Sequence, residues 1–367
     1  MATKRDPRID VLRGAALLMI FVDHVPADVL SLATMHNFGF ADAAEAFVLL
    51  AGMSSMLAYG RAFERGGPMD GLRRIVRRWA RLYLFQLGLL AMTLVVVLLW
   101  TRYYNLEPTI VRPFFEAPVS GILHGLTLQA VPAYLDILPL YLALFAIFPL
   151  IYFGLRLSRP LTLALSAGLW AAANFVPALN LPNWVDRGHW YFDPFAWQFL
   201  FAIGAAAVAV MAAHEGEFPR ARWAAWLCAG YLIFAFFETV PWSYWDLPDL
   251  RPIALPPPDK TTLAPLRLIH ILALAYLLFS SPRVRRVAGA RVFRPLDVCG
   301  RHSLEVFAVG CVAALLGRLV FRTYGPGLID QVAINLVGFI AMWTVALYLD
   351  ARQASGRHAP PPQARPG

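Results

Sequence analysis

The chain has 367 residues, of which 59% are apolar and only 15% are charged, and its mean hydropathy is +0.57. A soluble domain has about 45–50% apolar and about 25% charged residues, so this composition excludes a disordered protein, a coiled coil and a soluble enzyme of ordinary composition. Three scattered cysteines, with no CxxC or HExxH motif, exclude a disulfide scaffold and argue against a metal site. We therefore expect one integral membrane domain and no metal.

Ten apolar runs are long enough, or nearly so, to cross a bilayer core of about 30 Å as helices. They lie near residues 9–27, 42–60, 79–100, 134–154, 161–177, 193–213, 222–240, 264–281, 303–321 and 328–349. The sequence thus predicts an all-α polytopic membrane protein, a bundle of about ten transmembrane helices spanning residues 1–352. The stretch 118–131 is also apolar and could be a re-entrant or interfacial piece. The tail 353–367, rich in Pro, Ala and Arg, is expected to be disordered and cytoplasmic.

The positive charges predict the orientation of this bundle. If the N-terminus is inside, the inner segments hold 24 of the 32 Lys and Arg residues and the outer segments hold the other eight. Such a bias places both termini in the cytoplasm. It also explains the net charge of +9 without a nucleic-acid partner.

The first apolar run carries several ionisable side chains, which are costly in a membrane and are functional candidates for that reason. Arg13 and His24 are 11 residues apart, so on a helix they face one direction about 16 Å apart along the axis. Asp10 lies on the same stripe, and Asp23 directly precedes His24. A structural alternative is that Arg13 only pairs with Asp10 while His24 lies in the headgroup region.

The second run begins with Asp42 and Glu45, at the depth where His24 is expected. An acid followed three residues later by Glu is a capping box, which would be purely structural. A carboxylate beside a histidine is also a proton-transfer unit. Both interpretations stay open, and one residue could serve both.

A basic run precedes the third apolar segment, and Arg74, Arg77, Arg78 and Arg81 share one helical face within it. Arginines on the inner side of a membrane often only anchor the chain and contact anionic lipids. Guanidinium groups at this spacing would equally suit a polyphosphate ligand that approaches from the cytosol.

Polar side chains also occur in the outer halves of later runs. They are Asp136, Asp193, Trp197, Gln198, Arg267 and His270. An interfacial aromatic belt explains most of the nearby aromatic residues. Pairing with one another would explain Asp136, Arg267 and His270 structurally; otherwise they are candidates for a substrate path.

An inner basic site and an outer carboxylate–histidine cluster suggest chemistry that crosses the membrane. A phosphorylated donor would enter from the cytosol, and an acceptor hydroxyl would lose its proton on the outer side. A proton-coupled multi-helix transporter, with His24 and the acids as its relay, is the alternative.

Several motifs resemble those of membrane-bound type-three acyltransferases. The first run, from Arg8-Ile9-Asp10 to Asp23-His24, resembles their Arg-x10-His signature, and Arg78-x-x-Arg81 resembles their Arg-x-x-Arg motif. Five further segments resemble the OpgC branch of that family. They are residues 37–47, 134–141, 193–198, 266–270 and 300–304.

The resemblance implies a bacterial inner-membrane enzyme of ten helices that transfers succinyl groups onto periplasmic osmoregulated glucans. The donor would be acyl-CoA, with no permanently bound cofactor, and the partners would be the lipid bilayer and the glycan acceptor. A homo-oligomer is compatible with this expectation.

The resemblance also implies roles for the candidate residues. His24 would be the base, Arg13 its same-face partner, and Glu45 or Asp42 the group that orients it; Asp10 and Asp23 complete the candidate catalytic set. Arg78 and Arg81, with Arg74 and Arg77, would contact the CoA phosphates. Asp136, Arg267 and His270, with Asp193, Trp197 and Gln198, would line the acceptor or acyl path. Glu305 is more charged than the family pattern leads us to expect at that position.

Overall fold

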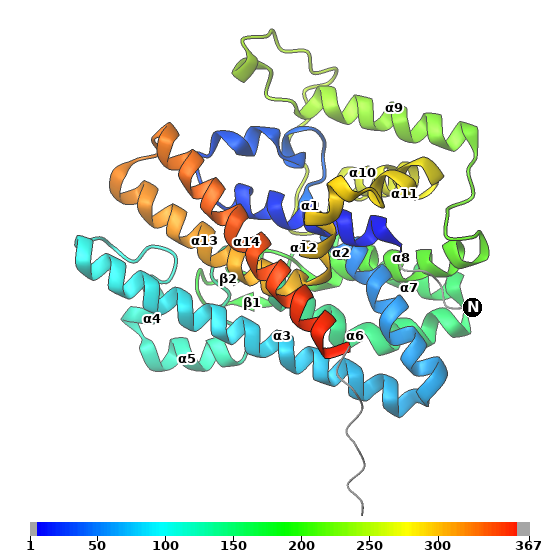
Figure 1. Ribbon diagram of the computed structural model, residues 1–367, viewed down its shortest axis with the longest axis horizontal. Helices are drawn as coiled ribbons and strands as arrows, with labels where there is room; N and C mark the ends of the chain where they lie inside the picture. The colour runs from blue at the N-terminus through cyan, green and yellow to red at the C-terminus, as the bar shows by residue number, and fades with distance from the viewer. Residues whose placement is uncertain (1–5, 358–367) are drawn as a thin grey trace, which may run out of the picture.

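The computed structural model describes residues 6–357, which are almost entirely helical (Figure 1). The α-helices are α1 (Pro7–Asp23), α2 (Ala43–Ser55), α3 (Arg61–Tyr104), α4 (Arg112–Glu116), α5 (Pro118–Leu126), α6 (Ile137–Leu157), α7 (Arg159–Phe175), α8 (Pro194–Ala213), α9 (Arg222–Thr239), α10 (Pro265–Phe279), α11 (Pro282–Ala288), α12 (Arg294–Arg301), α13 (Ser303–Tyr324) and α14 (Leu328–Arg357). Shorter helical turns are η1 (Val29–Ala33), η2 (Met35–Asn37), η3 (Met56–Gly60), η4 (Trp242–Trp245) and η5 (Arg291–Phe293). Two short strands, β1 (Pro182–Asn183) and β2 (Gly188–His189), pair antiparallel.

Each of the ten predicted apolar runs coincides with a helix, which confirms the all-α class. Within residues 6–357, five helical segments are long and apolar enough to cross a membrane, or six if the pair α10 and α11, bent by 83°, forms one span. The shorter α1, α7 and α9 do not meet that criterion. A membrane protein is therefore supported, while ten spans and two cytoplasmic termini stay predictions.

Helical structure extends beyond two of the predicted apolar segments. Residues 61–78, which lie between two predicted apolar runs, are helical, because α2 continues through the π-helical turn η3 into the 44-residue α3. Gly67 breaks α3 with a φ of 75°, a backbone conformation that favours glycine, and Pro68 follows it. At the other end, α14 runs five residues past the predicted boundary at 352. The rest of the predicted tail, 358–367, lies outside the described residues, as do Lys4 and Arg5.

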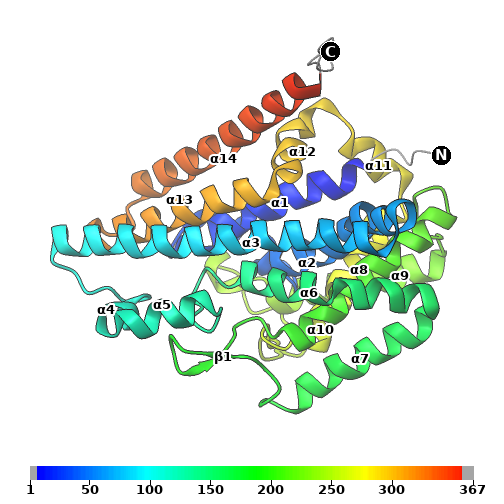
Figure 2. The ribbon, with the colours of Figure 1, turned by 90° about the horizontal axis from the view of Figure 1, so that it is seen from below.

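The segment 118–131 contains α5, a helix of nine residues that packs against α4 and α3. Figure 2 shows α4, α5 and β1 on one side of the long α3. A helix of this length is too short to cross a bilayer. It fits the interfacial or re-entrant piece that the sequence analysis allowed.

Helix α2 packs against α8 with backbone-to-backbone contact, and this fixes the position of its acidic first turn. A Cβ atom on Gly52 would lie 2.1 Å from the carbonyl oxygen of Phe201, and one on Gly204 would lie 2.2 Å from that of Leu49. Only glycine permits this approach on both helices. The start of α2 is thereby held against the loop that precedes α8.

Helix α1 is anchored at its start by Arg8, whose side chain is fully buried. The guanidinium pairs with Asp6 at 2.7 Å and with Glu217 at 2.6 Å, and it donates to the carbonyl oxygens of Gly216, Leu278 and Phe279. Because one side chain joins the N-terminus to two distant segments, α1 has a fixed depth and rotation in the bundle. It packs mainly on α12, α2 and α13.

Candidate functional site

Four charged side chains meet at the first turn of α2. Asp42 lies 2.6 Å from the Lys260 ammonium and 3.0 Å from the Arg267 guanidinium, and Glu45 lies 2.6 Å from Arg267. We call Asp42, Glu45, Lys260 and Arg267 the outer charge cluster. Its two acids and two bases compensate one another, which is what burial requires of charged groups.

The capping box predicted at Asp42 and Glu45 is confirmed. The Ala44 N–H donates to the Asp42 carboxylate at 2.8 Å, and the Asp42 N–H donates to the Glu45 carboxylate at 2.9 Å. Each acid therefore caps the helix with one oxygen and binds a cation with the other. The structural interpretation is correct, and a role in the charge cluster comes in addition to it.

Asp42 and Lys260 of the charge cluster are both ionised. Burial alone would raise the pKa of Asp42, but Lys260 and Arg267 lower it more, and the net result is well below its usual range. Burial lowers the pKa of Lys260, while Asp42 and Glu45 raise it to above its usual value. Both partners thus stay charged at neutral pH.

The loop that carries Lys260 is held in place by α8. The indole N–H of Trp197 donates to the carbonyl oxygens of Lys260 and Thr261, both at 3.1 Å, and the Asp193 N–H donates to Thr261 O at 3.1 Å. Asp193 also caps α8 through the Phe195 N–H. Gln198 instead ties α8 to α7 by donating to the Ser166 carbonyl at 2.8 Å. These contacts give Asp193, Trp197 and Gln198 positioning roles, and a direct role in the acceptor path stays a prediction.

His24 follows α1 and lies beside two groups from distant parts of the chain. Its ring centroid lies 5.1 Å from that of Tyr134, edge to face. Its carbonyl oxygen accepts a 2.9 Å hydrogen bond from Arg318, whose guanidinium lies 4.0 Å from the Tyr134 ring centroid. Tyr134 has a φ of 71°, unusual for a residue with a side chain, and such strain occurs often at functional sites.

These surroundings keep the imidazole neutral. Loss of hydration lowers the pKa of His24 to about 3, and Arg318 and Lys260 contribute to that shift, while Asp42 opposes it. At neutral pH the ring therefore has a free nitrogen lone pair that can accept a proton. The charges that act on it come from α13, the loop before α10 and the start of α2.

The acids predicted to orient His24 have other partners. The structure records no hydrogen bond from Asp42 or Glu45 to the imidazole; Asp42 acts on it only through its charge. Asp23 accepts a 2.6 Å hydrogen bond from Thr34 and lies 3.2 Å from the ring nitrogen Nδ1 of His36. A second carboxylate–histidine pair thus lies next to His24 in the chain.

Arg13 binds across the bundle. Its guanidinium donates to the Leu50 carbonyl at 3.1 Å and to the Ser54 hydroxyl of α2, and it lies 3.9 Å from Asp10. The Arg13–Asp10 contact is the structural pairing that the sequence allowed. The charges of Arg13 and Arg78 both act on the buried phenol of Tyr141. Arg13 of α1 and Arg78, a predicted donor-binding residue, therefore both lie near the Tyr141 side chain.

The four arginines on the inner face of α3 differ in their partners. Arg74 pairs with Asp70 at 3.0 Å on the surface, and Arg77 is exposed. Arg81 is paired with Glu305 of α13, which accounts for the acid that departs from the family pattern. Arg78 is half-buried, and no ion pair joins it to another described side chain. The face is therefore basic and open, as phosphate binding requires, and donor binding itself stays a prediction.

Asp136 and His270 do not pair with Arg267, so the mutual pairing suggested from sequence is not found. Burial raises the pKa of Asp136, just before α6, to about 6. His270 is buried, and the backbone of Gly39 lies against its ring so closely that a Cβ there would be 1.9 Å from Cε1. Its Nδ1 atom has no hydrogen-bond partner among the described residues. Their role in an acyl or acceptor path stays a prediction.

Two cavities with charged side chains in their walls adjoin this site. The outer cavity, of about 560 Å³, has Asp42, Arg267 and His36 in its wall together with Trp242 and Arg251. The second, of about 410 Å³, is lined by Tyr134, Arg318 and Arg322 and by apolar side chains of α3 and α13; we call it the Arg318 cavity. Among residues 6–357, no three His, Cys, Asp or Glu side chains are placed to hold a metal ion.

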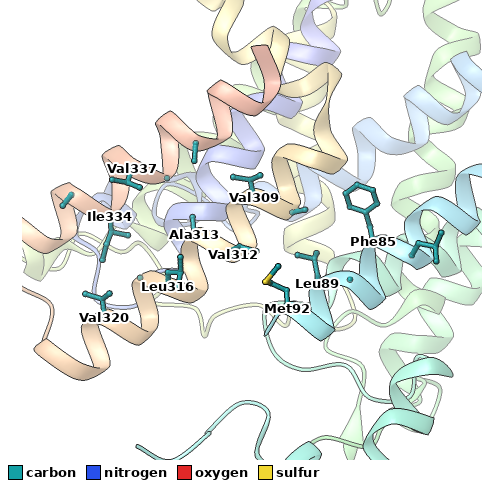
Figure 3. Close-up of a pocket in the computed structure, with 17 residues that line it drawn as sticks. Phe85, Leu89, Met92, Val309, Val312, Ala313, Leu316, Val320, Ile334 and Val337 are labelled. Carbon is teal, nitrogen blue, oxygen red and sulfur yellow. The ribbon is translucent and has the colours of Figure 1, made fainter. Parts of the chain in front are cut away.

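A third hollow is a groove of about 760 Å³ between α3, α13 and α14. Figure 3 shows that its labelled side chains, such as Phe85, Met92 and Leu316, are all apolar. It has no titratable group in its lining, so it offers no acid–base chemistry. The polar site lies elsewhere, at the ends of α1 and α2.

The sequence analysis missed Lys260, Arg318 and Tyr134 as site residues. Lys260 is one of only two lysines in the chain, and it follows three prolines and an aspartate. Arg318 lies inside an otherwise apolar run, where an ionisable residue is a functional candidate by default. Both were counted only as topology signals, although their rarity and position were visible.

The fold and the site together define a polytopic helical membrane protein with a neutral histidine and a compensated charge cluster at one end of its bundle. The chain belongs to the OpgC family: the family model described as "OpgC protein" matches residues 5–354, nearly the whole chain. Membership implies a membrane enzyme of the acyltransferase type, and it favours the enzyme over the carrier. Neither the curated proteins nor the solved structures contain a match to this chain.

Proposed function

We propose that the protein is a transmembrane O-acyltransferase that moves a succinyl group from cytosolic acyl-CoA to a hydroxyl of a periplasmic osmoregulated glucan. The observation that carries the proposal is the position of His24, whose ring lies edge to face with Tyr134 and whose carbonyl oxygen binds Arg318, a residue that also contacts Tyr134. A neutral imidazole at this place has a nitrogen lone pair that can accept the proton of an acceptor hydroxyl.

In the proposed reaction, His24 accepts the hydroxyl proton as the acceptor oxygen forms a bond to the thioester carbonyl carbon. The carbon–sulfur bond then breaks, and the CoA thiolate takes the proton from the imidazolium. The charge of Asp42 favours the transient imidazolium, whereas Arg318 and Lys260 disfavour it, so the proton passes readily to the departing thiolate.

On the donor side, Arg78 and Arg81 of α3 are proposed to bind the CoA phosphates, with Arg74 and Arg77 beside them. Guanidinium groups form paired hydrogen bonds with phosphate oxygens, which suits a diphosphate ligand. Arg81 would release Glu305 when the ligand binds and would pair with a phosphate group instead. Arg13 and Arg78 both lie near Tyr141. We place Arg13 along the route that the acyl group would take.

On the acceptor side, the outer cavity is proposed to hold the glucan. Its wall combines the aromatic ring of Trp242 with the charged side chains of Asp42, Arg267 and Arg251. Aromatic faces stack on sugar rings, and carboxylate and guanidinium groups bind their hydroxyls. Because Asp42 and Arg267 belong to the charge cluster, the cavity adjoins the groups that act on His24.

The test is product analysis with the full chain in lipid nanodiscs. Succinyl-CoA and a glucan oligosaccharide are supplied together or singly, and the glucan is examined by mass spectrometry. We expect a mass gain of one succinyl group per modified hydroxyl only when both are present. Substrate flux in sealed vesicles without acyl-CoA and without acylated product would instead support the transporter.

A further inference from the structure

The guanidinium of Arg318 has far fewer partners than its donors require. An arginine has five N–H donors. Arg318 uses one of them, in the 2.9 Å bond to the His24 carbonyl, and its Nε atom is buried without a hydrogen-bond partner. No carboxylate among the described residues forms an ion pair with it, in contrast to Arg8, Arg81 and Arg267.

The positive charge of Arg318 is partly compensated by the face of the Tyr134 ring. The Arg318 guanidinium lies 4.0 Å from the ring centroid, a cation–π contact. Such a contact compensates a cation less completely than a carboxylate does and leaves the N–H donors unsatisfied. Among residues 6–357, no carboxylate pairs with this guanidinium, so its free N–H donors can bind an anionic ligand.

The Arg318 cavity is the space in which such an anion would bind. It measures about 410 Å³, and its lining contains Arg318 and Arg322 but no acidic side chain. Arg322 already donates to the Glu107 carbonyl and to the Thr109 hydroxyl. The remaining wall is mainly apolar, formed by side chains such as Val97, Leu315 and Leu319. A ligand with a short apolar stem and a carboxylate at its end matches this wall.

We propose that Arg318 binds the free carboxylate of a dicarboxylic acyl group and is the residue that selects such a group over an uncharged one. This inference rests on the proposed acyltransferase function. The acyl stem would lie along the apolar wall, with its thioester end toward His24, because Tyr134 contacts both His24 and Arg318. The carboxylate would receive paired N–H donors from the guanidinium.

The inference predicts discrimination by charge rather than by size. Butyryl has nearly the shape of succinyl but lacks the second carboxylate, so it would leave the guanidinium uncompensated. Loss of one charge-assisted contact corresponds to about ten- to hundredfold in rate. We therefore expect kcat/KM for succinyl-CoA to exceed that for butyryl-CoA by at least about tenfold in the unaltered protein.

The experiment compares succinyl-CoA, butyryl-CoA and acetyl-CoA as donors for a glucan oligosaccharide, with the full chain in nanodiscs. In Arg318→Gln, the ratio of succinyl to butyryl transfer should fall toward one, whereas Arg318→Lys should keep an intermediate ratio. Arg322→Gln is the matched control, since Arg322 lines the same cavity but donates to Glu107 and Thr109 instead of His24, and its ratio should stay unchanged. Thermal unfolding in detergent checks that each variant is folded.

Three results would overturn the inference. One is a ratio near one in the unaltered protein, which requires no variant to fold. Another is an equal fall of succinyl and butyryl transfer in Arg318→Gln, which would make Arg318 only a support for His24. A third is loss of selectivity in Arg322→Gln but not in Arg318→Gln. If the unaltered protein transfers no acyl group at all, the proposed function itself fails, which is a distinct outcome.

Discussion

The two charged regions of the molecule are built in opposite ways. The inner face of α3 presents arginines of which three are exposed, and its ion pairs with Asp70 and Glu305 lie near the surface. The outer charge cluster has Glu45 fully enclosed and joins residues more than 200 positions apart in the chain. An open basic face suits a large soluble ligand that comes and goes, while an enclosed cluster suits fixed positioning of reacting groups.

The largest effect is expected at His24, which the account places at the reaction. His24→Ala removes the proton acceptor, so transfer should fall by about 10²- to 10⁴-fold. The measurement is the rate of glucan acylation at saturating donor. Unfolding temperature in detergent serves as the control for insertion and folding, and a rate within twofold of normal would remove His24 from the mechanism.

The second largest effect is expected on the stability of the protein, to which the outer charge cluster contributes. Arg267→Gln leaves the buried Glu45 carboxylate without its 2.6 Å partner, and breaking a buried pair costs about 3–5 kcal/mol. We expect a marked fall in the unfolding temperature and partial recovery when Glu45→Gln is added. If the double variant is no more stable than Arg267→Gln alone, the pair does not contribute as described.

A smaller effect is expected on the inner face. Arg78→Gln and Arg81→Gln should each raise KM for acyl-CoA by about tenfold, the value of one charge-assisted contact, with little change in kcat. Arg102→Gln, which is exposed at the far end of the same helix, is the matched control. Glu305→Gln frees Arg81 from its ion pair and should lower KM. Unchanged donor affinity in the first two variants would make those arginines topological anchors only.

The smallest effect is a pH dependence of stability at Asp193. Burial raises the pKa of this carboxyl from 3.8 to about 6. The folded state thus binds the proton more tightly than the unfolded state, and this contribution to stability is lost as pH rises from about 4 to about 6. Asp193→Asn should flatten the unfolding temperature across that window. The exposed Asp246→Asn should leave the profile unchanged, and a similar flattening there would contradict the assignment.

Local patterns made much of the fold predictable from sequence. Each apolar run became a helix, and the capping box at Asp42 and Glu45 formed as their three-residue spacing predicts. The helical face predicted for Arg74, Arg77, Arg78 and Arg81 lies within α3, and exposed arginine is a good helix former.

Long-range pairing could not be predicted in the same way. The sequence allowed Arg267 to pair with Asp136 and His270, yet it binds acids at the start of α2, more than 200 residues away. That choice depends on the close contact of α2 with α8 and on the loop that Trp197 holds, neither of which has a local pattern. The candidate residues were therefore largely identified, while their partners required the three-dimensional structure.

The central claim is that an acyl group from one side of the membrane reaches a hydroxyl on the other side at His24. The most direct measurement uses proteoliposomes of one protein orientation, with succinyl-CoA confined to the cytoplasmic-face compartment and glucan to the opposite one. We predict acylated glucan with the unaltered protein and none with His24→Ala. Acylation at equal rates in both, or only when donor and glucan share a compartment, would contradict the account.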